Sequence, residues 1–298
     1  MKVFVTGATG YIGNAIVHAL IARGYSVIAL ARSASSEGAL RPLGVEVLRG
    51  SIAEREAYES TAAGCDAAIH AAFDQGPDAV KADRAAIDAL LAAARRQKKI
   101  QSLIFTSGVW VLGNTGEKPA TESSPIEHPP KLVSWRPAHE RQVLEATAGA
   151  LKTAVLRPGI VYGEKRGLIS PMFEQATKEG FVEFVGDGKN HWSFIHREDL
   201  AALYATIIEK QGAGVFHGVD DQPVRLANAA AAISKAAGRG GATRSLPAER
   251  ARQKIGPLVD AFLLDQRVSA PRSRELGWKP TRESFLKGVV AAYDEWRG

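Results

Sequence analysis

KVFVTGATGYIG, residues 2–13, is the stretch that decides the fold. The apolar VFV that opens it is typical of a strand buried on both faces. Glycines then recur every third residue, at Gly7, Gly10 and Gly13, and apolar residues at helical spacing follow over residues 11–23. The order of strand, glycine turn and helix predicts the first unit of a dinucleotide-binding sheet.

The residue types in this turn suit a pyrophosphate. Gly7 allows a tight turn, Gly10 lets the backbone approach the phosphates, and Gly13 lets the helix pack closely on the strand. Free N–H groups and the positive dipole end of the helix attract an anion. We therefore expect a dinucleotide to be held by Gly7, Thr9, Gly10, Tyr11, Ile12 and Gly13. The alternative is an ordinary glycine-rich turn.

The composition indicates a folded, soluble chain. It has 298 residues, of which 45% are hydrophobic, and no apolar run approaches the roughly 20 residues of a membrane span. The first strand begins within three residues, which leaves no room for a signal peptide, so we expect a cytoplasmic protein without a membrane partner. Cys65 is the single cysteine, and the histidines lack metal-ligand spacing, so we predict no disulfide and no metal.

The net charge of +6 raises the question of nucleic acid. The basic residues are spread along the chain, and their densest group, Arg95, Arg96, Lys98 and Lys99, ends a predicted helix where cations favour the dipole. A nucleic-acid site needs a clustered basic face, so we predict a small-molecule substrate and no nucleic acid. A homodimer is compatible with the sequence.

The end of the second predicted strand, residues 25–30, selects the cofactor. NAD-preferring folds place an acid there to bind the ribose 2′-hydroxyl, whereas an arginine suits a 2′-phosphate. Here Arg32 follows the strand and no acid is present, which predicts NADP(H) in preference to NAD(H). Ser51 and Ile52, after a third strand at 45–48, are expected beside the adenine. The alternative is that Arg32 is a solvated loop residue.

Strands and helices alternate regularly through the first half of the chain. Further strands are expected at 67–72, 103–107 and 153–157, and further helices at 53–62, 78–96 and 136–148. This alternation predicts an α/β Rossmann fold, a doubly wound parallel sheet, with a smaller mixed and mostly helical C-terminal lobe. We expect residues 1–163 to form the dinucleotide-binding domain, with 192–220 returning to it. The substrate lobe would comprise 164–191 and 221–298.

Several motifs together resemble those of the extended short-chain dehydrogenase/reductases, the epimerase and dehydratase type. They are TGATGYIG at 6–13, HAA at 70–72, FTS at 105–107, RPGIVYG at 157–163, IHREDL at 195–200 and LGWKP at 276–280. The resemblance covers nearly the whole chain. It implies additional cofactor contacts from His70, Ala71, Ala72, Thr106, Ser107, His139, Pro158, Gly159 and Ile160.

The catalytic signature of that family is a Tyr-x-x-x-Lys pair with a serine, and this chain departs from it. Trp135 and His139 stand where the resemblance places the Tyr and the Lys, and Ser107 lies one residue before the usual serine position, which is Gly108. An indole N–H donates but does not titrate, whereas imidazole exchanges protons near neutral pH. We expect His139, Ser107 and Trp135 to be the catalytic residues, with His139 as proton donor or ribose ligand, or else a structural histidine.

Four more side chains are expected at the substrate: Trp110, Tyr162, His191 and Trp192. For Tyr162 and Trp192, packing in the core is the alternative. The sequence thus predicts an NADP(H)-dependent oxidoreductase of the atypical short-chain dehydrogenase/reductase type, acting on a small carbonyl or conjugated carbonyl compound. The alternative is a non-catalytic NAD(P)-binding sensor, since the Tyr and the Lys are missing.

Overall fold

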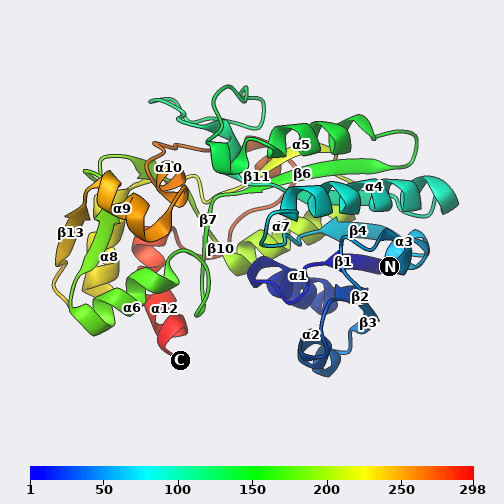
Figure 1. Ribbon diagram of the computed structural model, residues 1–298, viewed down its shortest axis with the longest axis horizontal. Coiled ribbons are helices and arrows are strands. Elements are labelled where there is room, and N and C mark those ends of the chain that lie inside the picture. Colours follow the sequence, from blue (N-terminus) through cyan, green and yellow to red (C-terminus); the bar gives the residue numbers. More distant parts are fainter.

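A computed structural model describes residues 1–298, and its main body is a seven-stranded parallel sheet (Figure 1). The strand order is β11-β6-β5-β4-β1-β2-β3, and every neighbouring pair is parallel. This confirms the doubly wound sheet expected from the alternation of strands and helices. The strands are β1 (Lys2–Thr6), β2 (Ser26–Ala31), β3 (Glu46–Arg49), β4 (Ala67–His70), β5 (Ser102–Thr106), β6 (Lys152–Pro158) and β11 (Gly214–Gly218).

Helices cover both faces of this sheet, and the alternating side chains of the strands fill two cores. In β1, Val3 and Val5 join the core on one face, while Phe4 joins the core on the other. The first face carries α1 (Tyr11–Ala22), α2 (Ala34–Leu40) and α7 (Arg197–Glu209). The second carries α3 (Arg55–Ala63), α4 (Ala79–Gln97) and α5 (Arg136–Glu145).

The glycine turn is held by very close backbone contacts. A Cβ atom on Gly13 would lie 2.0 Å from the carbonyl oxygen of Gly7, so α1 packs directly on the turn. Gly7 has a φ of 76°, and a Cβ there would lie 2.5 Å from the carbonyl oxygen of Ala71, just after β4. Only glycine fits at both positions.

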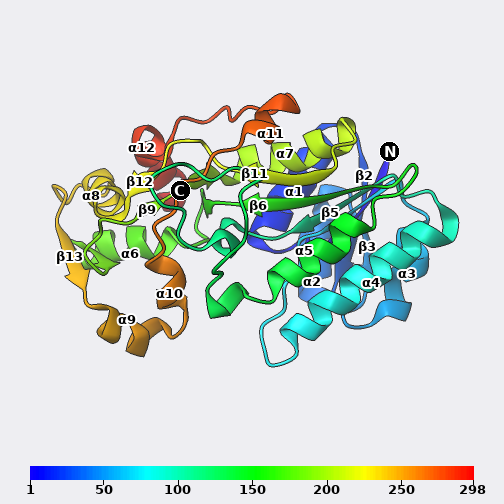
Figure 2. The same ribbon diagram turned by 90° about the horizontal axis from the view of Figure 1, so that it is seen from above.

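A second, smaller body packs beside one end of the sheet (Figure 2). Its core includes Phe194 and Phe285, whose rings stack with centroids 4.0 Å apart. It contains short strands and most of the C-terminal helices: α6 (Ser170–Glu179), β7 (Ile160–Tyr162), β8 (Val182–Val185), β9 (His191–Trp192), β10 (Phe194–His196), β12 (Val224–Arg225), α8 (Leu226–Ala236), β13 (Thr243–Leu246), α9 (Ala248–Ile255), α10 (Leu258–Phe262) and α12 (Phe285–Arg297). None of the helices is both long enough and apolar enough to cross a membrane.

The chain passes between the two bodies more often than the sequence indicates. Strand β11 extends the main sheet, and Val268, Ala270 and Trp278 pack in the core beside α1 and α7. The short helix α11 (Pro271–Glu275) lies on this return. The indole of Trp278 donates to the carbonyl oxygen of Asp199 at the start of α7 (2.9 Å). Part of the segment 221–298, expected wholly in the lobe, therefore belongs to the first core.

A buried polar chain attaches α5 to the sheet. The Nδ1 atom of His70, the last residue of β4, lies 2.7 Å from the hydroxyl of Thr6, and its Nε2 lies 3.3 Å from Asp83 of α4. The other carboxylate oxygen of Asp83 lies 2.7 Å from Nδ1 of His139 on α5. Burial alone would raise the pKa of Asp83, but hydrogen bonds from His139 and His70 outweigh it and hold that pKa below its ordinary value.

Replacing Gly13 by valine should lower the free energy of unfolding by about 3 kcal/mol or more, because the new side chain meets backbone that cannot move aside. Urea denaturation measures this. Gly38→Ala in α2 is the matched control, because nothing lies within 4 Å of its Cβ position. That change should leave stability equal or raise it by up to about 1 kcal/mol. Similar stabilities for the two variants would contradict the packing described here.

Asp83→Asn should lower the free energy of unfolding at pH 7 by about 1–3 kcal/mol, because it weakens the buried hydrogen bond with His139 and the contact with His70. The depressed pKa of Asp83 stabilises the fold above the unfolded-state value of about 4, and this contribution is lost as the pH falls through the folded-state pKa. The difference between wild type and variant should therefore shrink below about pH 4. Asp88→Asn on the exposed face of α4 should cost less than about 1 kcal/mol. An effect of Asp83→Asn that is independent of pH down to acid unfolding would refute this assignment.

Candidate active site

The first cavity is a groove of about 370 Å³ at the carboxyl ends of β1, β2 and β4, which we call the glycine groove. Parallel sheets bind ligands at this edge. Of the residues expected at the cofactor, it brings together nine, namely Gly7, Thr9, Gly10, Tyr11, Ile12, Arg32, Ile52, Ala71 and Ala72. Six further residues line the groove and were not among those expected at the cofactor, namely Leu30, Ala31, Ser36, Gly50, Phe73 and Asp74.

The groove fits a dinucleotide diphosphate. Helix α1 begins at its floor with no side-chain cap and no acidic residue in the first turn, so its first N–H groups are free for an anion. A Cβ on Gly10 would lie 3.0 Å from the carbonyl oxygen of Gly7, which is a tight contact, so glycine keeps the turn compact and adds no side chain above it. A bound NAD(P) would supply hydride chemistry, and these backbone groups would hold its phosphates.

Arg32 crosses the mouth of the groove. Its Nη1 atom lies 2.7 Å from a carboxylate oxygen of Asp74, which follows β4, and its side chain is 67% exposed. No carboxylate follows β2 directly, where a ribose 2′-hydroxyl would be bound. Asp74 was not expected at the site, because the loop after the HAA motif shows no pattern that predicts its direction.

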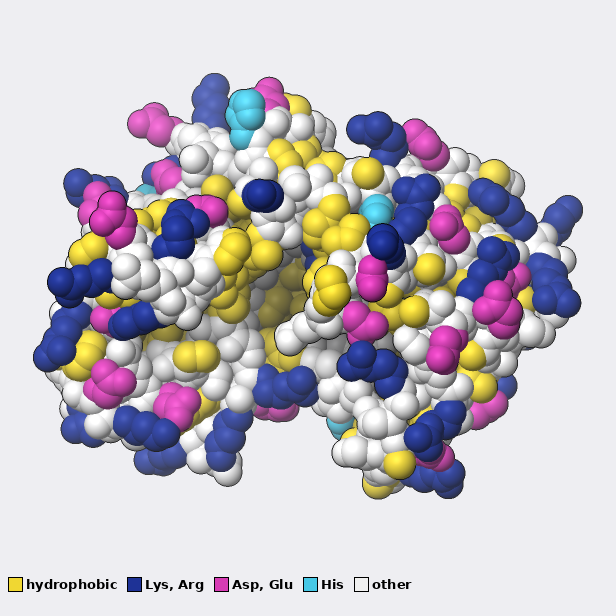
Figure 3. All heavy atoms as spheres, viewed as in Figure 1, with side chains coloured by type: hydrophobic (Ala, Val, Ile, Leu, Met, Phe, Trp, Pro, Cys, Tyr) yellow, Lys and Arg dark blue, Asp and Glu magenta, His cyan; other side chains and the backbone are white.

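The second cavity, which we call the central cavity, lies between the two bodies and has a volume of about 380 Å³. Figure 3 shows the hollow there with hydrophobic atoms exposed on its walls. Seventeen residues line the cavity, and 11 of them are hydrophobic. The seventeen are Tyr11, Ile12, Phe73, Ser107, Gly108, Val109, Trp110, Leu132, Val133, Trp135, Arg136, Pro158, Gly159, Ile160, Val161, Gly167 and Leu168. Tyr11, Ile12 and Phe73 also line the glycine groove, so the two cavities are neighbours.

Two of the expected catalytic residues, Ser107 and Trp135, line the central cavity, and they differ in whether their polar group has a hydrogen-bond partner. The Ser107 hydroxyl is buried and has no hydrogen-bond partner in the protein, so its hydrogen-bonding capacity is unused. The indole N–H of Trp135 donates to the carbonyl oxygen of Leu132 (3.2 Å). Trp135 therefore offers its ring face, which stacks on Phe73 with centroids 5.1 Å apart.

Arg136 is a cation in this apolar cavity, and it was not expected there. Its Nη1 atom donates to the carbonyl oxygen of Thr106 (3.0 Å), and its Cζ atom lies 4.5 Å from the ring centroid of Trp135. Loss of hydration lowers the pKa of the guanidinium below its ordinary value. An arginine at the first position of a helix is ordinarily solvated, so the sequence carries no signal for this placement.

Five residues expected at the cofactor line neither cavity. His70 and His139 are buried in the polar chain with Asp83, and Gly13 lies beneath the turn. The Thr106 hydroxyl lies 2.7 Å from that of Tyr204, and the Ser51 hydroxyl accepts from the N–H of Ala53. The structure therefore presents His139 as an anchor of α5, since its Nδ1 atom is already committed to Asp83.

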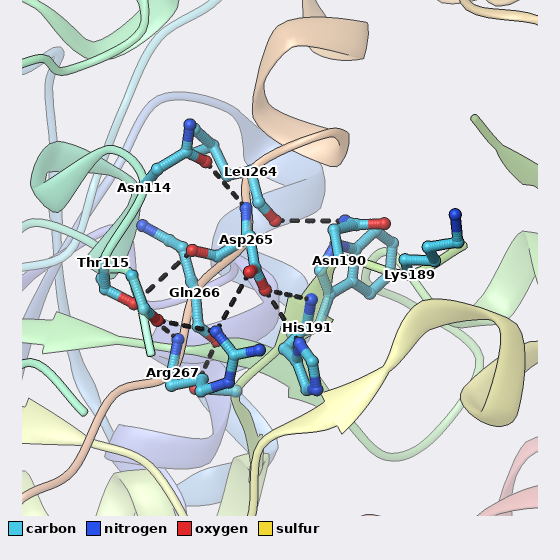
Figure 4. Close-up of polar contacts among 12 residues, drawn as sticks. Asn114, Thr115, Lys189, Asn190, His191, Leu264, Asp265, Gln266 and Arg267 are labelled. Atoms are coloured by element: carbon cyan, nitrogen blue, oxygen red, sulfur yellow. Dashed lines mark hydrogen bonds and ion pairs between the residues drawn. The ribbon is translucent and has the colours of Figure 1, made fainter. Parts of the chain in front are cut away.

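Three of the four expected substrate residues lie outside the central cavity, and only Trp110 lines it. Figure 4 shows His191 beside Asp265, with Nδ1 2.8 Å from a carboxylate oxygen. Trp192 is buried, and its indole donates to the carbonyl oxygen of Phe262. Tyr162 is also buried, and its hydroxyl donates to the carbonyl oxygen of Glu283. These three residues pack the second body instead, because their polar atoms find partners within it.

Comparison with known proteins agrees with this geometry. The family model described as the NAD dependent epimerase/dehydratase family matches residues 3–217. An uncharacterized protein of Schizosaccharomyces pombe is 31% identical, over 98% of this chain and 99% of its own length. The 4-hydroxy-2-methyl-3-oxo-4-farnesyl-3,4-dihydroquinoline-1-oxide ketoreductase of Stigmatella aurantiaca is also 31% identical, over 76% of this chain and 70% of its own.

Solved structures share the fold. The human epimerase family protein SDR39U1 with NADPH superimposes with a TM-score of 0.83 at 20% identity, covering 99% of both chains. The dTDP-glucose 4,6-dehydratase of Bacillus anthracis in complex with NAD also gives 0.83, at 18% identity, covering 100% of this chain and 96% of its own. Since the family model spans most of the chain, the protein belongs to the NAD-dependent epimerase/dehydratase family and is an NAD(P)-dependent oxidoreductase of that type.

Proposed function

We propose that the protein is an NADP(H)-dependent reductase of a small carbonyl or conjugated carbonyl compound. The observation that carries this proposal is the unpartnered hydroxyl of Ser107 on the wall of an apolar cavity that adjoins the glycine groove. A hydride from the cofactor would reach the carbonyl carbon in this cavity, and the Ser107 O–H would donate to the oxygen as negative charge develops on it. Solvent water would then supply the proton that converts the alkoxide to the alcohol.

The preference for NADP(H) rests on Arg32. Its exposed guanidinium lies at the groove and can exchange Asp74 for a 2′-phosphate, a dianion that it binds with two parallel hydrogen bonds. Solved structures of this fold hold either NADPH or NAD, so the fold alone does not decide the choice, and the proposal rests on Arg32.

The apolar lining supports a carbonyl compound of small size. A sugar nucleotide would bring a second diphosphate, and the central cavity offers one cationic side chain and mostly hydrophobic walls. The quinoline ketoreductase among the relatives is named for a reaction at a carbonyl group, which is in keeping with this proposal.

We assign His139 a positioning role and not that of the proton donor. It is 5% exposed, lines neither cavity and is held by Asp83. The missing Tyr and Lys are the one observation in favour of a non-catalytic NAD(P) sensor, whereas membership of the family favours an oxidoreductase. Turnover decides between the two readings, because a sensor binds the dinucleotide without oxidising it.

Ser107→Ala should lower kcat/KM for carbonyl reduction by about tenfold to a hundredfold, because a hydrogen bond made to developing charge is lost. NADPH oxidation with a panel of aldehydes, ketones and enones measures this, and NADPH affinity by calorimetry should stay unchanged. Ser134→Ala, which removes an exposed hydroxyl outside the cavity, is the control. Tight NADPH binding with no turnover on any compound would favour the sensor.

NADPH should bind more tightly than NADH, and Arg32→Ala should remove most of the difference. We expect the change to weaken NADPH by about tenfold to a hundredfold, since a charge-assisted hydrogen bond to phosphate is lost, and NADH by less than about threefold. Titration calorimetry with both cofactors is the measurement. Arg41→Ala removes an exposed arginine that does not line the groove and should change neither affinity. Equal affinities in the wild type would disprove the preference.

A further inference from the structure

The guanidinium of Arg136 has no carboxylate partner, although two carboxylates lie near it in the fold. Asp83 is occupied by His70 and His139. Glu140, one turn along the same helix, is bound through both oxygens by Arg157, at 3.1 and 2.6 Å. No acidic side chain lies within ion-pair distance of Arg136, and its one hydrogen bond in the protein goes to the carbonyl oxygen of Thr106.

Most of the N–H donors of the Arg136 guanidinium have no acceptor in the protein. A guanidinium has five N–H donors, and the protein takes up one of them. The Cζ atom of Arg136 lies 4.5 Å from the ring centroid of Trp135 and 5.4 Å from that of Phe73, so the two ring faces stabilise the positive charge. The rings do not accept hydrogen bonds from the remaining N–H groups, which lie in the plane of the guanidinium. A cation partly removed from water and left unpaired costs free energy, which an anionic ligand would recover.

We propose that Arg136 binds the carboxylate of the substrate, so that the enzyme reduces apolar oxo acids. This inference rests on the reductase function proposed above. A planar carboxylate matches the fork of a guanidinium, which forms two parallel hydrogen bonds with it. Leu132, Val133 and Leu168 provide the apolar wall for the rest of such a molecule.

The same geometry limits the distance between the two groups of the substrate. Arg136 is tethered to Thr106, and Ser107 is the next residue, so the carboxylate and carbonyl sites are adjacent at the end of β5. A 2-oxo or 3-oxo acid has its carbonyl close enough to the carboxylate to reach both groups.

The cofactor phosphates are a poor match for Arg136. The N–H groups that would bind the phosphates lie at the start of α1, in the glycine groove. Arg136 lines the central cavity and not the glycine groove. The side chains shared by the two cavities, Tyr11, Ile12 and Phe73, lie between the two sets of donors and carry no cation.

Binding to the full-length protein saturated with NADP⁺ tests the inference without turnover. 4-Phenylbutanoate should bind about tenfold to a hundredfold more tightly than 4-phenylbutanamide, which has the same body and no charge. Arg136→Met should abolish that ratio, and Arg136→Lys should retain part of it, since lysine keeps the charge without the fork. Arg141→Met removes an exposed arginine on the same helix and should leave the ratio unchanged.

The second test measures the rate of NADPH oxidation with 2-oxo-4-phenylbutanoate and with its ethyl ester. The ester is the more electrophilic ketone, so a higher kcat/KM for the acid in the wild type, reversed in Arg136→Met, would support carboxylate binding. Reduction of both probes with no preference for the acid would overturn the inference and leave the reductase function standing. Failure to reduce either probe or any compound of the aldehyde, ketone and enone panel, combined with selective binding of 4-phenylbutanoate, would overturn the reductase function and leave the anion site standing.

The variants also separate the two possible ligands of the guanidinium. A loss of NADPH affinity in Arg136→Met equal to its loss of 4-phenylbutanoate affinity would assign Arg136 to the cofactor and overturn the inference. Equal affinity of the wild type for 4-phenylbutanoate and its amide would also overturn the inference. This comparison uses the wild-type protein alone, so it does not depend on whether a variant folds.

Discussion

The contact between Gly13 and the carbonyl oxygen of Gly7 is the constraint on which the rest of the molecule depends. Because no side chain separates them, α1 starts directly over the end of β1 and directs its free N–H groups into the groove. The same approach places Tyr11 and Ile12 between the two cavities. The Tyr11 hydroxyl then donates to the carbonyl oxygen of Gly163, which leads into the second body (2.6 Å). One missing side chain thus sets the spacing between dinucleotide loop and lobe.

At the start of α5, Trp135 and His139 stand where the resemblance to the family implies a catalytic Tyr and Lys, and both are bound within the protein. His139 is tied to Asp83, and the Trp135 indole is tied to the backbone, so neither polar group faces the central cavity unpaired. The polar groups left free there are the Ser107 hydroxyl and the Arg136 guanidinium. We propose that Arg136 binds the substrate and Ser107 stabilises the developing negative charge, while solvent water supplies the proton that a tyrosine supplies in the pattern of the family.

The sequence predicts the main sheet well, because strands buried on both faces leave unbroken apolar runs and the glycine spacing has few structural solutions. It missed β11, where Gly214 and Gly218 flank a short run that lacks a strand signature. Contacts across the chain were also beyond reach, since nothing local indicates that Asp265 pairs with His191. For Trp192 the alternative expectation, packing in the core, is the one that the structure bears out. Arg136 was missed because helical spacing fixes the angular position of a residue but not whether a neighbouring element shields it from water.

The repeated passage of the chain between the two bodies restricts how such an enzyme diversifies. The core beside α1 and α7 contains residues from 195–219 and from 268–278, and the intervening segments belong to the other body. The lobe is therefore not one contiguous module, and transplanting it from a relative would require several simultaneous exchanges that all preserve the junction. New specificities in this architecture arise more readily from single replacements in the cavity wall, where Leu132 and Leu168 meet solvent at the rim, than from recombination of whole segments.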